Sequence, residues 1–279
     1  DRYEPRRHAA VLVLKELAVN APTLFYVHVP AFVELIWGAL RDAKITIREG
    51  AIEALRACLD LIAERESRLR QQWYQKIFEE AQKGFRANNS DHIHGSLLVI
   101  GELLRNTGDF MKPKFGEVCE TVIKYKESSN KLVKKTVIVI LPRLAEYNAE
   151  LFEHQYLHSV VSHLLTRKDA DRATAFISLG QISIAVGPAI LPYLDNILSS
   201  LRSGLSTKGK HTTVNEALAC IGMLARAVGP EVASRTDLLP HMFAAGLSPT
   251  LCAALTDLAR HAPALLPSIQ ERLLHVLSP

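Results

Sequence analysis

The sequence predicts an all-α fold built from stacked helical hairpins, and three observations support this prediction. An apolar triplet spaced i, i+4, i+7 recurs seven times along the 279 residues. Its central residues lie 41, 45, 41, 38, 42 and 34 residues apart, and a period near ~40 residues is typical of two-helix HEAT or armadillo repeats. Apolar residues recur at intervals of three and four rather than two, which favours helices over strands. The triplets are Ala10/Leu14/Leu17, Ala51/Leu55/Cys58, Ser96/Ile100/Leu103, Val137/Leu141/Leu144, Ala175/Leu179/Ile182, Ala217/Ile221/Leu224 and Leu251/Leu255/Leu258.

We therefore expect an α-α superhelix, a HEAT/armadillo-like solenoid of about seven helical hairpins. Each triplet marks a first helix, and a proline follows several of these helices at Pro22, Pro188, Pro230 and Pro263. Gly187 and Gly229 precede two of the prolines, and we expect them to supply the left-handed conformation that caps a helix. The second helices are predicted at Phe32–Leu40, Arg68–Phe85, Lys114–Lys126, Glu150–Leu165, Leu191–Leu201, Leu238–Leu247 and Leu266–Leu277.

Short polar segments connect the hairpins, and none resembles a linker between domains. Asp42 lies in one of these turns and Arg48 opens the next helix, which is the HEAT arrangement that links neighbouring repeats. The last helix still presents several apolar residues, whereas a terminal repeat needs a polar outer face. We therefore predict one HEAT array over 1–279, cut from a longer solenoid. Its approximate repeats are 2–42, 43–88, 89–128, 129–167, 168–207, 208–247 and 248–279.

Composition and charge indicate a soluble, intracellular protein. The 33 basic and 29 acidic residues give a net charge of only +4, so non-specific nucleic-acid binding is not expected. The four cysteines are scattered without metal-ligand spacing, which is typical of reduced core residues. The aliphatic runs are far shorter than the ~18 residues of a membrane span, and the charged start is unlike a signal peptide. We expect no transmembrane segment.

The sequence contains no recognisable catalytic, cofactor-binding or metal-binding set. A glycine-rich phosphate loop and a His-Arg-Asp catalytic loop are both missing, and Met111 follows Asp109-Phe110 where a kinase would have glycine. His154, His158 and His163 lie on one predicted helix. No Cys or carboxylate completes a tetrahedral metal site around them, so polar surface histidines are favoured. This segment is therefore not expected to be an enzyme or to need a cofactor.

Two groups of residues are candidate partner contacts. The first is a basic cluster that would attract phosphate or anionic lipid, although a solvated edge between repeats is the favoured alternative. The second is the aromatic pair Trp73 and Tyr74, a kind of residue common at interfaces, for which burial between repeats is favoured about two to one. A groove for single-stranded nucleic acid needs a row of aromatic residues, and the basic cluster contains only Tyr125. The cluster comprises Lys124, Lys126, Lys131, Lys134 and Lys135.

Several stretches together resemble the N-terminal HEAT region of the target of rapamycin kinases. They cover nearly the whole chain and combine rare residues in a fixed order, which a general HEAT consensus does not supply. Gln72-Trp73-Tyr74 and Gly246-Leu247-Ser248-Pro249 are the most specific of them. The stretches are Ile47–Leu59, Gln72–Phe85, His92–Gly95, Thr174–Gly180, Met223–Pro230 and Gly246–Arg260.

This resemblance implies a large serine/threonine protein kinase that regulates growth in response to nutrients, with its catalytic domain outside this segment. The segment would be a scaffold that assembles the kinase dimer. It would also bind a raptor-like substrate-recruiting subunit or its complex-2 counterpart. The resemblance further implies a cytoplasmic protein that associates peripherally with lysosomal, vacuolar or other endomembranes. A HEAT adaptor for nuclear transport or nucleic-acid binding is the alternative, although neither a basic inner face nor rows of acidic and aromatic residues are present.

Overall fold

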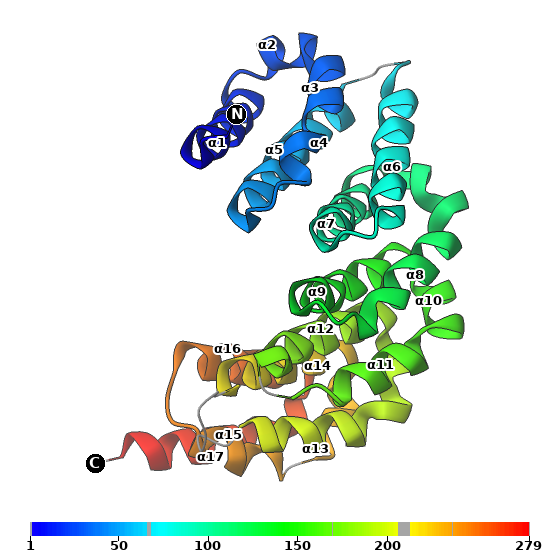
Figure 1. Cartoon of the computed structure of the whole chain (residues 1–279). Helices are drawn as coiled ribbons and strands as arrows, with labels where there is room; N and C mark the ends of the chain where they lie inside the picture. Colours follow the sequence, from blue (N-terminus) through cyan, green and yellow to red (C-terminus); the bar gives the residue numbers. More distant parts are fainter. Residues whose placement is uncertain (1, 66–67, 169, 206–212, 236, 279) are drawn as a thin grey trace. The chain divides into compact units, whose positions relative to one another are not determined.

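A computed structural model of the chain describes residues 2–65, 68–168, 170–205, 213–235 and 237–278 (Figure 1). Every regular element in these ranges is helical, so the all-α prediction is confirmed for the described part of the chain. The long first helices carry the apolar triplets. They are α1 (Glu4–Asn20), α5 (Ile45–Glu64), α7 (Ser90–Asn106), α9 (Lys131–Tyr147), α12 (Ala170–Val186), α14 (Val214–Ala233) and α16 (Pro249–His261).

A second segment follows each first helix along the chain and is usually broken into short pieces. One piece begins at Pro22, and three others follow 3-10 turns (η) that contain Pro113, Pro188 with Pro192, and Pro263, since proline lacks the N–H that a regular helix needs. They are α2 (Pro22–Val27), α3 (Val29–Leu35), α4 (Trp37–Leu40), α6 (Arg70–Arg86), η1 (Gly108–Lys114), α8 (Phe115–Lys124), η2 (Tyr125–Glu127), α10 (Ala149–Gln155), α11 (Leu157–Leu165), η3 (Gly187–Tyr193), α13 (Leu194–Gly204), α15 (Leu238–Ala244), η4 (Pro263–Leu265) and α17 (Leu266–Leu277).

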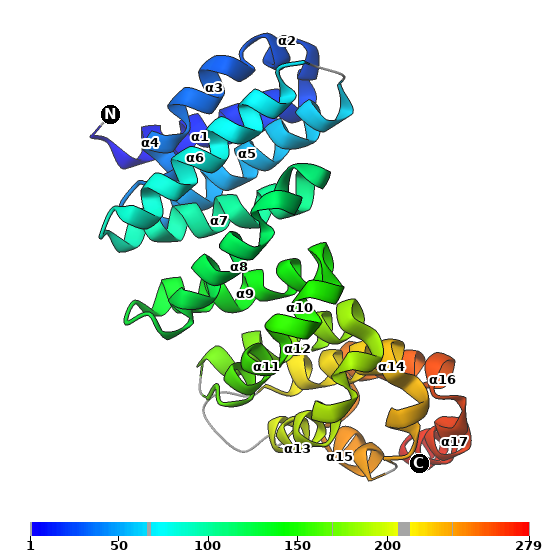
Figure 2. The ribbon, with the colours of Figure 1, turned by 90° about the vertical axis from the view of Figure 1, so that its right-hand side faces the viewer.

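The chain forms two compact units, Asp1–Arg143 and Leu144–Pro279. In the first unit α5 packs between α1 and α7, while α3 contacts α6 in the layer of second helices. In the second unit α14 packs between α12 and α16, while α13 contacts α11 and α15. Figure 2 shows this side-by-side packing of first helices within each unit. Each unit is therefore a two-layer stack of neighbouring hairpins, as the triplet pattern predicts.

The apolar triplets form the core, with one exception. From the second repeat to the seventh, every triplet residue is buried, with at most 5% of its surface exposed. In the first repeat Leu17 is 40% exposed, Ala10 is also exposed and Leu14 is only half-buried. Burial of a Leu or Ile side chain contributes about 1.5–3 kcal/mol. The first helix therefore leaves apolar surface uncovered that its counterparts bury.

Prolines follow the ends of several first helices as predicted. Of the two glycines expected to be left-handed caps, only one has that conformation. Gly187 has φ +55° and supplies the expected left-handed cap before Pro188. The expectation for Gly229 was wrong, because the break falls one residue earlier, at Val228 with φ −145° and ψ 50°. Gly229 is instead required by close packing, since a Cβ there would lie 1.9 Å from the carbonyl oxygen of His261.

Gly95 gives a similar close approach between α7 and the end of α4, and it supports a prediction. A Cβ at this position would lie 1.9 Å from the backbone oxygen of Leu40. Gly95→Ala should therefore lower the free energy of unfolding by about 1–3 kcal/mol, although alanine is the better helix former. Gly116→Ala in α8 is the control, because no atom lies within 4 Å of its added Cβ. Urea unfolding followed by circular dichroism measures both, and equal stability of the two variants would contradict the prediction.

One stretch of the described chain, from 170 to 204, is long and apolar enough to cross a membrane on length and composition alone. Half of its most apolar window is buried inside the protein. The left-handed Gly187 separates α12 from η3 and α13 within this stretch. A buried core helix passes the same compositional test, so the expectation of no transmembrane segment stays a prediction.

Candidate protein-contact surfaces

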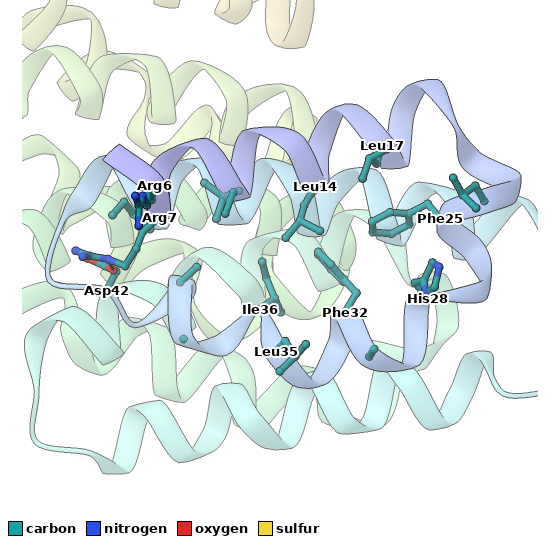
Figure 3. Close-up of a pocket in the computed structure, with 17 residues that line it drawn as sticks. Arg6, Arg7, Leu14, Leu17, Phe25, His28, Phe32, Leu35, Ile36 and Asp42 are labelled. Atoms are coloured by element: carbon teal, nitrogen blue, oxygen red, sulfur yellow. Dashed lines mark hydrogen bonds and ion pairs between the residues drawn. The ribbon is translucent and has the colours of Figure 1, made fainter. Parts of the chain in front are cut away.

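An apolar groove of about 650 Å³ lies on the first unit, between α1 and the segment α2–α4. Figure 3 shows Leu14 of α1 facing Phe32 and Ile36 across this groove, with Arg7 and Asp42 at one end and His28 toward the other. The opening is lined almost entirely by apolar side chains. An apolar concave surface with polar groups at its ends is suited to binding an amphipathic element.

The floor and the rim of this groove differ in exposure. The floor is core, with Phe25, Phe32 and Ile36 each at most 5% exposed. Leu24 and Leu35 form part of the rim and are 61% and 77% exposed. The exposed apolar surface of the groove therefore comes from its rim rather than from its floor. Sequence inspection missed Leu24 and Leu35, and their signal is a run of apolar residues outside the triplet pattern.

The triplet pattern explains why this groove is open. Ala10, Leu14 and Leu17 all line it, whereas the same positions in the other repeats pack against neighbouring helices. Among the described residues, no helix packs over this opening. The groove is therefore the surface on which a repeating architecture would place another helical element.

Ion pairs fix the polar end of the groove. Arg7 Nε donates to Asp42 Oδ2 at 2.7 Å, and the backbone N–H of Lys44 donates to the same carboxylate at 2.9 Å. Burial opposes ionisation of Asp42, but these hydrogen bonds outweigh it and lower its pKa below the usual value. The carboxylate therefore stays charged and anchors the turn after α4, as the HEAT pattern of Asp42 predicts.

Arg48 is the most buried cation of the described chain, at 2% exposure. It donates from Nε to His94 Nδ1 at 3.0 Å and from a terminal nitrogen to Asp91 Oδ1 at 2.8 Å. A further hydrogen bond reaches the carbonyl oxygen of Asp42. Burial, and then the positive charge of Arg48, lower the pKa of His94 to about 4, which keeps its imidazole neutral as the acceptor. This network joins the turn after α4 to α5 and α7.

Glu102 is a second buried centre and links three successive first helices. It is 2% exposed and accepts two hydrogen bonds from Arg56 of α5, at 2.8 and 3.0 Å. Arg143 of α9 donates to it at 3.1 Å. Burial opposes ionisation of Glu102, but the bonds from Arg56 and the charge of Arg143 outweigh this and lower its pKa. All these charges are paired, so the network is structural and offers no free group for chemistry.

The structure places Trp73 and Tyr74 in the core rather than on a partner surface. They are 8% and 2% exposed. The ring of Trp73 packs edge-on against the ring of Tyr26, with their centroids 5.9 Å apart. The ring centroids of Tyr74 and Phe110 lie 5.5 Å apart. Their proposed role as partner contacts is therefore corrected. Adjacent hairpins bury both rings, which was the favoured alternative in the sequence analysis. Large aromatic rings fill the space between α6 and its neighbours.

The predicted lysine cluster lies where α8 ends and α9 begins. Lys124, Lys131 and Lys135 are exposed, while Lys126 and Lys134 are half-buried. The Tyr125 ring within the cluster stacks on Phe85 at 5.7 Å, and its hydroxyl donates to the Phe85 carbonyl at 3.1 Å. The lysines are thus accessible to solvent, whereas the half-buried Tyr125 is held by its contacts with Phe85.

The remaining candidates do not form a reactive site. No group of three or more His, Cys, Asp or Glu side chains in the described ranges is arranged to hold a metal ion. His154 Nδ1 lies 2.7 Å from the carbonyl oxygen of Glu150, within its own helix. Burial raises the pKa of the thiols of Cys58, Cys119 and Cys220 to about 12. These thiols therefore stay protonated and are not nucleophiles.

Comparison with known proteins identifies the chain. No family model matches it. It is 47% identical over 282 residues to the serine/threonine-protein kinase TOR of Arabidopsis thaliana, and this match covers all of the chain but 11% of that kinase. It is 38% identical to tor1 of Schizosaccharomyces pombe and 35% identical to TOR2 of Saccharomyces cerevisiae, again over the whole chain and 12% of each relative. The chain belongs to the target of rapamycin family.

Within this family the chain corresponds to the N-terminal HEAT region and spans about 11% of the length of the relatives it matches. The matched part lies at the N-terminal end of these kinases and does not include a kinase domain. The segment is therefore non-catalytic. Its resemblance to target of rapamycin kinases, inferred from motifs such as Gln72-Trp73-Tyr74, is confirmed.

Solved structures confirm the solenoid fold. The chain superimposes on a crystal structure of Kap121p with a TM-score of 0.73 over 99% of its length, at 14% identity and over 30% of that protein. A structure of Kap121p bound to Pho4p gives a TM-score of 0.64 over 98% of the chain and 34% of that protein, at 12% identity. At such low identity the likeness concerns the fold alone.

Proposed function

We propose that this chain is a non-catalytic assembly scaffold within a target of rapamycin kinase that regulates growth in response to nutrients. The observation that carries the proposal is the match of the entire chain to one end of these kinases. The described helices also form an apolar groove, which is suited to binding another protein segment. Stacked hairpins suit this role because each adds to one extended surface.

The groove between α1 and α2–α4 would receive an apolar helix from another part of the same kinase chain. Two observations support this occupant. The triplet Ala10/Leu14/Leu17 is equivalent to triplets that contact a neighbouring hairpin elsewhere. The relatives are also far longer than this chain, so most of the polypeptide that would supply such a helix lies outside it.

Other surfaces of the two units would bind the regulatory partners. By family resemblance these are a raptor-like substrate-recruiting subunit or its complex-2 counterpart, together with other parts of the kinase dimer. The chain would then act in the cytoplasm, with peripheral association to lysosomal, vacuolar or other endomembranes through the complex. The alternative of a nuclear-transport adaptor has only the fold likeness to Kap121p in its favour, at 14% identity.

Leucines on the rim of the groove provide a test in the full-length kinase. Leu24→Asp with Leu35→Asp places two charges on exposed positions, so the local fold should be retained. We expect co-purification of the substrate-recruiting subunit to fall, because a charged rim rejects an apolar helix and disturbs the scaffold. Phosphorylation of a short peptide substrate should stay near the wild-type level.

The control is Leu247→Asp, which adds a charge at an apolar residue that is 52% exposed and lies outside the groove. It should leave both readouts unchanged. A double variant that keeps its recruiting subunit but loses peptide phosphorylation would overturn the scaffold assignment. Binding of the subunit at wild-type levels, with activity also intact, would show that the groove is not needed for recruiting the subunit.

A further inference from the structure

Four lysines at the junction of α8 and α9 lack the ion pairs that other lysines of the first unit make. We call Lys124, Lys131, Lys134 and Lys135 the lysine edge. None of them has an ion pair among the described residues. Five other lysines of this unit form ion pairs, as Lys15 does with Glu53 at 2.8 Å. The stretch 120–135 holds five lysines against two glutamates, Glu120 and Glu127, so it is net positive.

The position of these lysines on α9 is itself unfavourable. Lys131, Lys134 and Lys135 lie in the first two turns, at the positive end of the helix dipole, where acidic residues are preferred. Asn130 caps this end, with its side-chain oxygen accepting from the backbone N–H groups of Leu132 and Val133 at 3.0 Å. Among the described residues, no ion pair of Lys131, Lys134 or Lys135 offsets the added positive charge. A carboxylate supplied from outside would relieve it.

The exposed face of α9 also carries an apolar residue, Val139, on the same side as two of the lysines. Lys131, Lys135 and Val139 follow one another at four-residue intervals, so they lie on the same face. All three are exposed, Val139 to 47%. With a rise of about 1.5 Å per residue, they span about 12 Å along the helix. A partner helix with acidic side chains followed by an apolar one, at the same spacing, would match this face.

Two other classes of anionic partner fit less well. Single-stranded nucleic acid is held by stacking on aromatic rings, but Tyr125 already stacks on Phe85. Surfaces that bind membranes combine lysines with inserted Trp, Phe or Leu side chains, and the exposed face offers only Val139. A protein segment needs neither feature.

We infer that the lysine edge binds an acidic segment of a partner protein, with carboxylates against Lys131 and Lys135 and an apolar side chain against Val139. This inference rests on the proposed scaffold function and names the chemistry of one of its partners. It differs from the groove in both occupant and location, so the two can fail separately.

The experiment uses the purified full-length kinase and a fluorescein-labelled helical peptide of glutamate with one leucine per turn. Lys131→Gln with Lys135→Gln should weaken binding, measured by fluorescence anisotropy, by about tenfold at low salt. Val139→Asn should weaken it less. The matched control is Lys76→Gln with Lys112→Gln, which removes the same charge from exposed lysines already paired with Glu34 and Asp109. It should bind the peptide as the wild type does.

Unchanged binding by the Lys131/Lys135 variant would overturn the inference, provided its thermal unfolding matches the wild type. Equal weakening by the control would also overturn it, because overall charge would then explain binding. Vesicles of phosphatidylcholine with phosphatidylserine, and a single-stranded oligonucleotide, are tested in parallel. If the vesicles or the oligonucleotide bind in a lysine-dependent way and the peptide does not, the inference of a protein partner is wrong and the lysine edge binds that ligand instead. If the Lys131/Lys135 variant binds the peptide normally while the Leu24/Leu35 variant loses its subunit, the lysine-edge inference is wrong but the proposed scaffold function is retained.

Discussion

Replacing Arg48 with methionine should lower the free energy of unfolding by about 3–5 kcal/mol. Methionine fills a similar volume, so the loss comes from the partners rather than from a cavity. The substitution leaves His94 Nδ1, the carbonyl oxygen of Asp42 and the carboxylate of Asp91 without their shared donor. Two of these acceptors lie in or beside the core, where an unsatisfied polar group costs about 1–3 kcal/mol.

Urea unfolding of the 279-residue chain, followed by circular dichroism, measures this loss. The control is Lys15→Met, which breaks the partly exposed pair with Glu53 and should change the free energy of unfolding far less, because exposed ion pairs contribute little. A change of less than 1 kcal/mol for Arg48→Met would mean that the buried network contributes little beyond packing. In that case His94→Leu combined with Arg48→Met should be more stable than the wild type.

Ile221→Ala should lower the free energy of unfolding by about 2–5 kcal/mol. Ile221 is fully buried on α14, the helix that packs between α12 and α16. Truncation removes three carbon atoms and leaves a cavity that the two neighbouring helices cannot fill without moving. Because helical repeats couple to their nearest neighbours, the loss should loosen α12 and α16 before more distant helices.

Hydrogen exchange measured by mass spectrometry tests this localisation. Protection should fall in peptides around Leu224 and change little around Leu14. Ile184→Ala serves as the control, since Ile184 on α12 is 44% exposed, and it should cost about 0.5 kcal/mol. An equal rise of exchange at Leu14 and Leu224 would contradict nearest-neighbour coupling.

The sequence by itself determined the helical class and most of the core. Six triplets predicted from spacing alone are buried, because residues at i, i+4 and i+7 share one helix face wherever the helix packs. The motif resemblance also determined the family. Pro22, Pro188 and Pro263 correctly marked the ends of three first helices, because proline disfavours helix continuation, whereas Pro142 lies inside α9.

Only the tertiary structure decided which helix faces are covered. The first triplet has the same pattern as the others, yet Leu17 stays exposed beside an open groove, because burial depends on the presence of a neighbour. Trp73 is buried although its type suits an interface. Gly229 is needed for the approach of His261 rather than for a left-handed cap. Each of these outcomes depends on contacts between segments far apart in the chain, which local spacing does not encode.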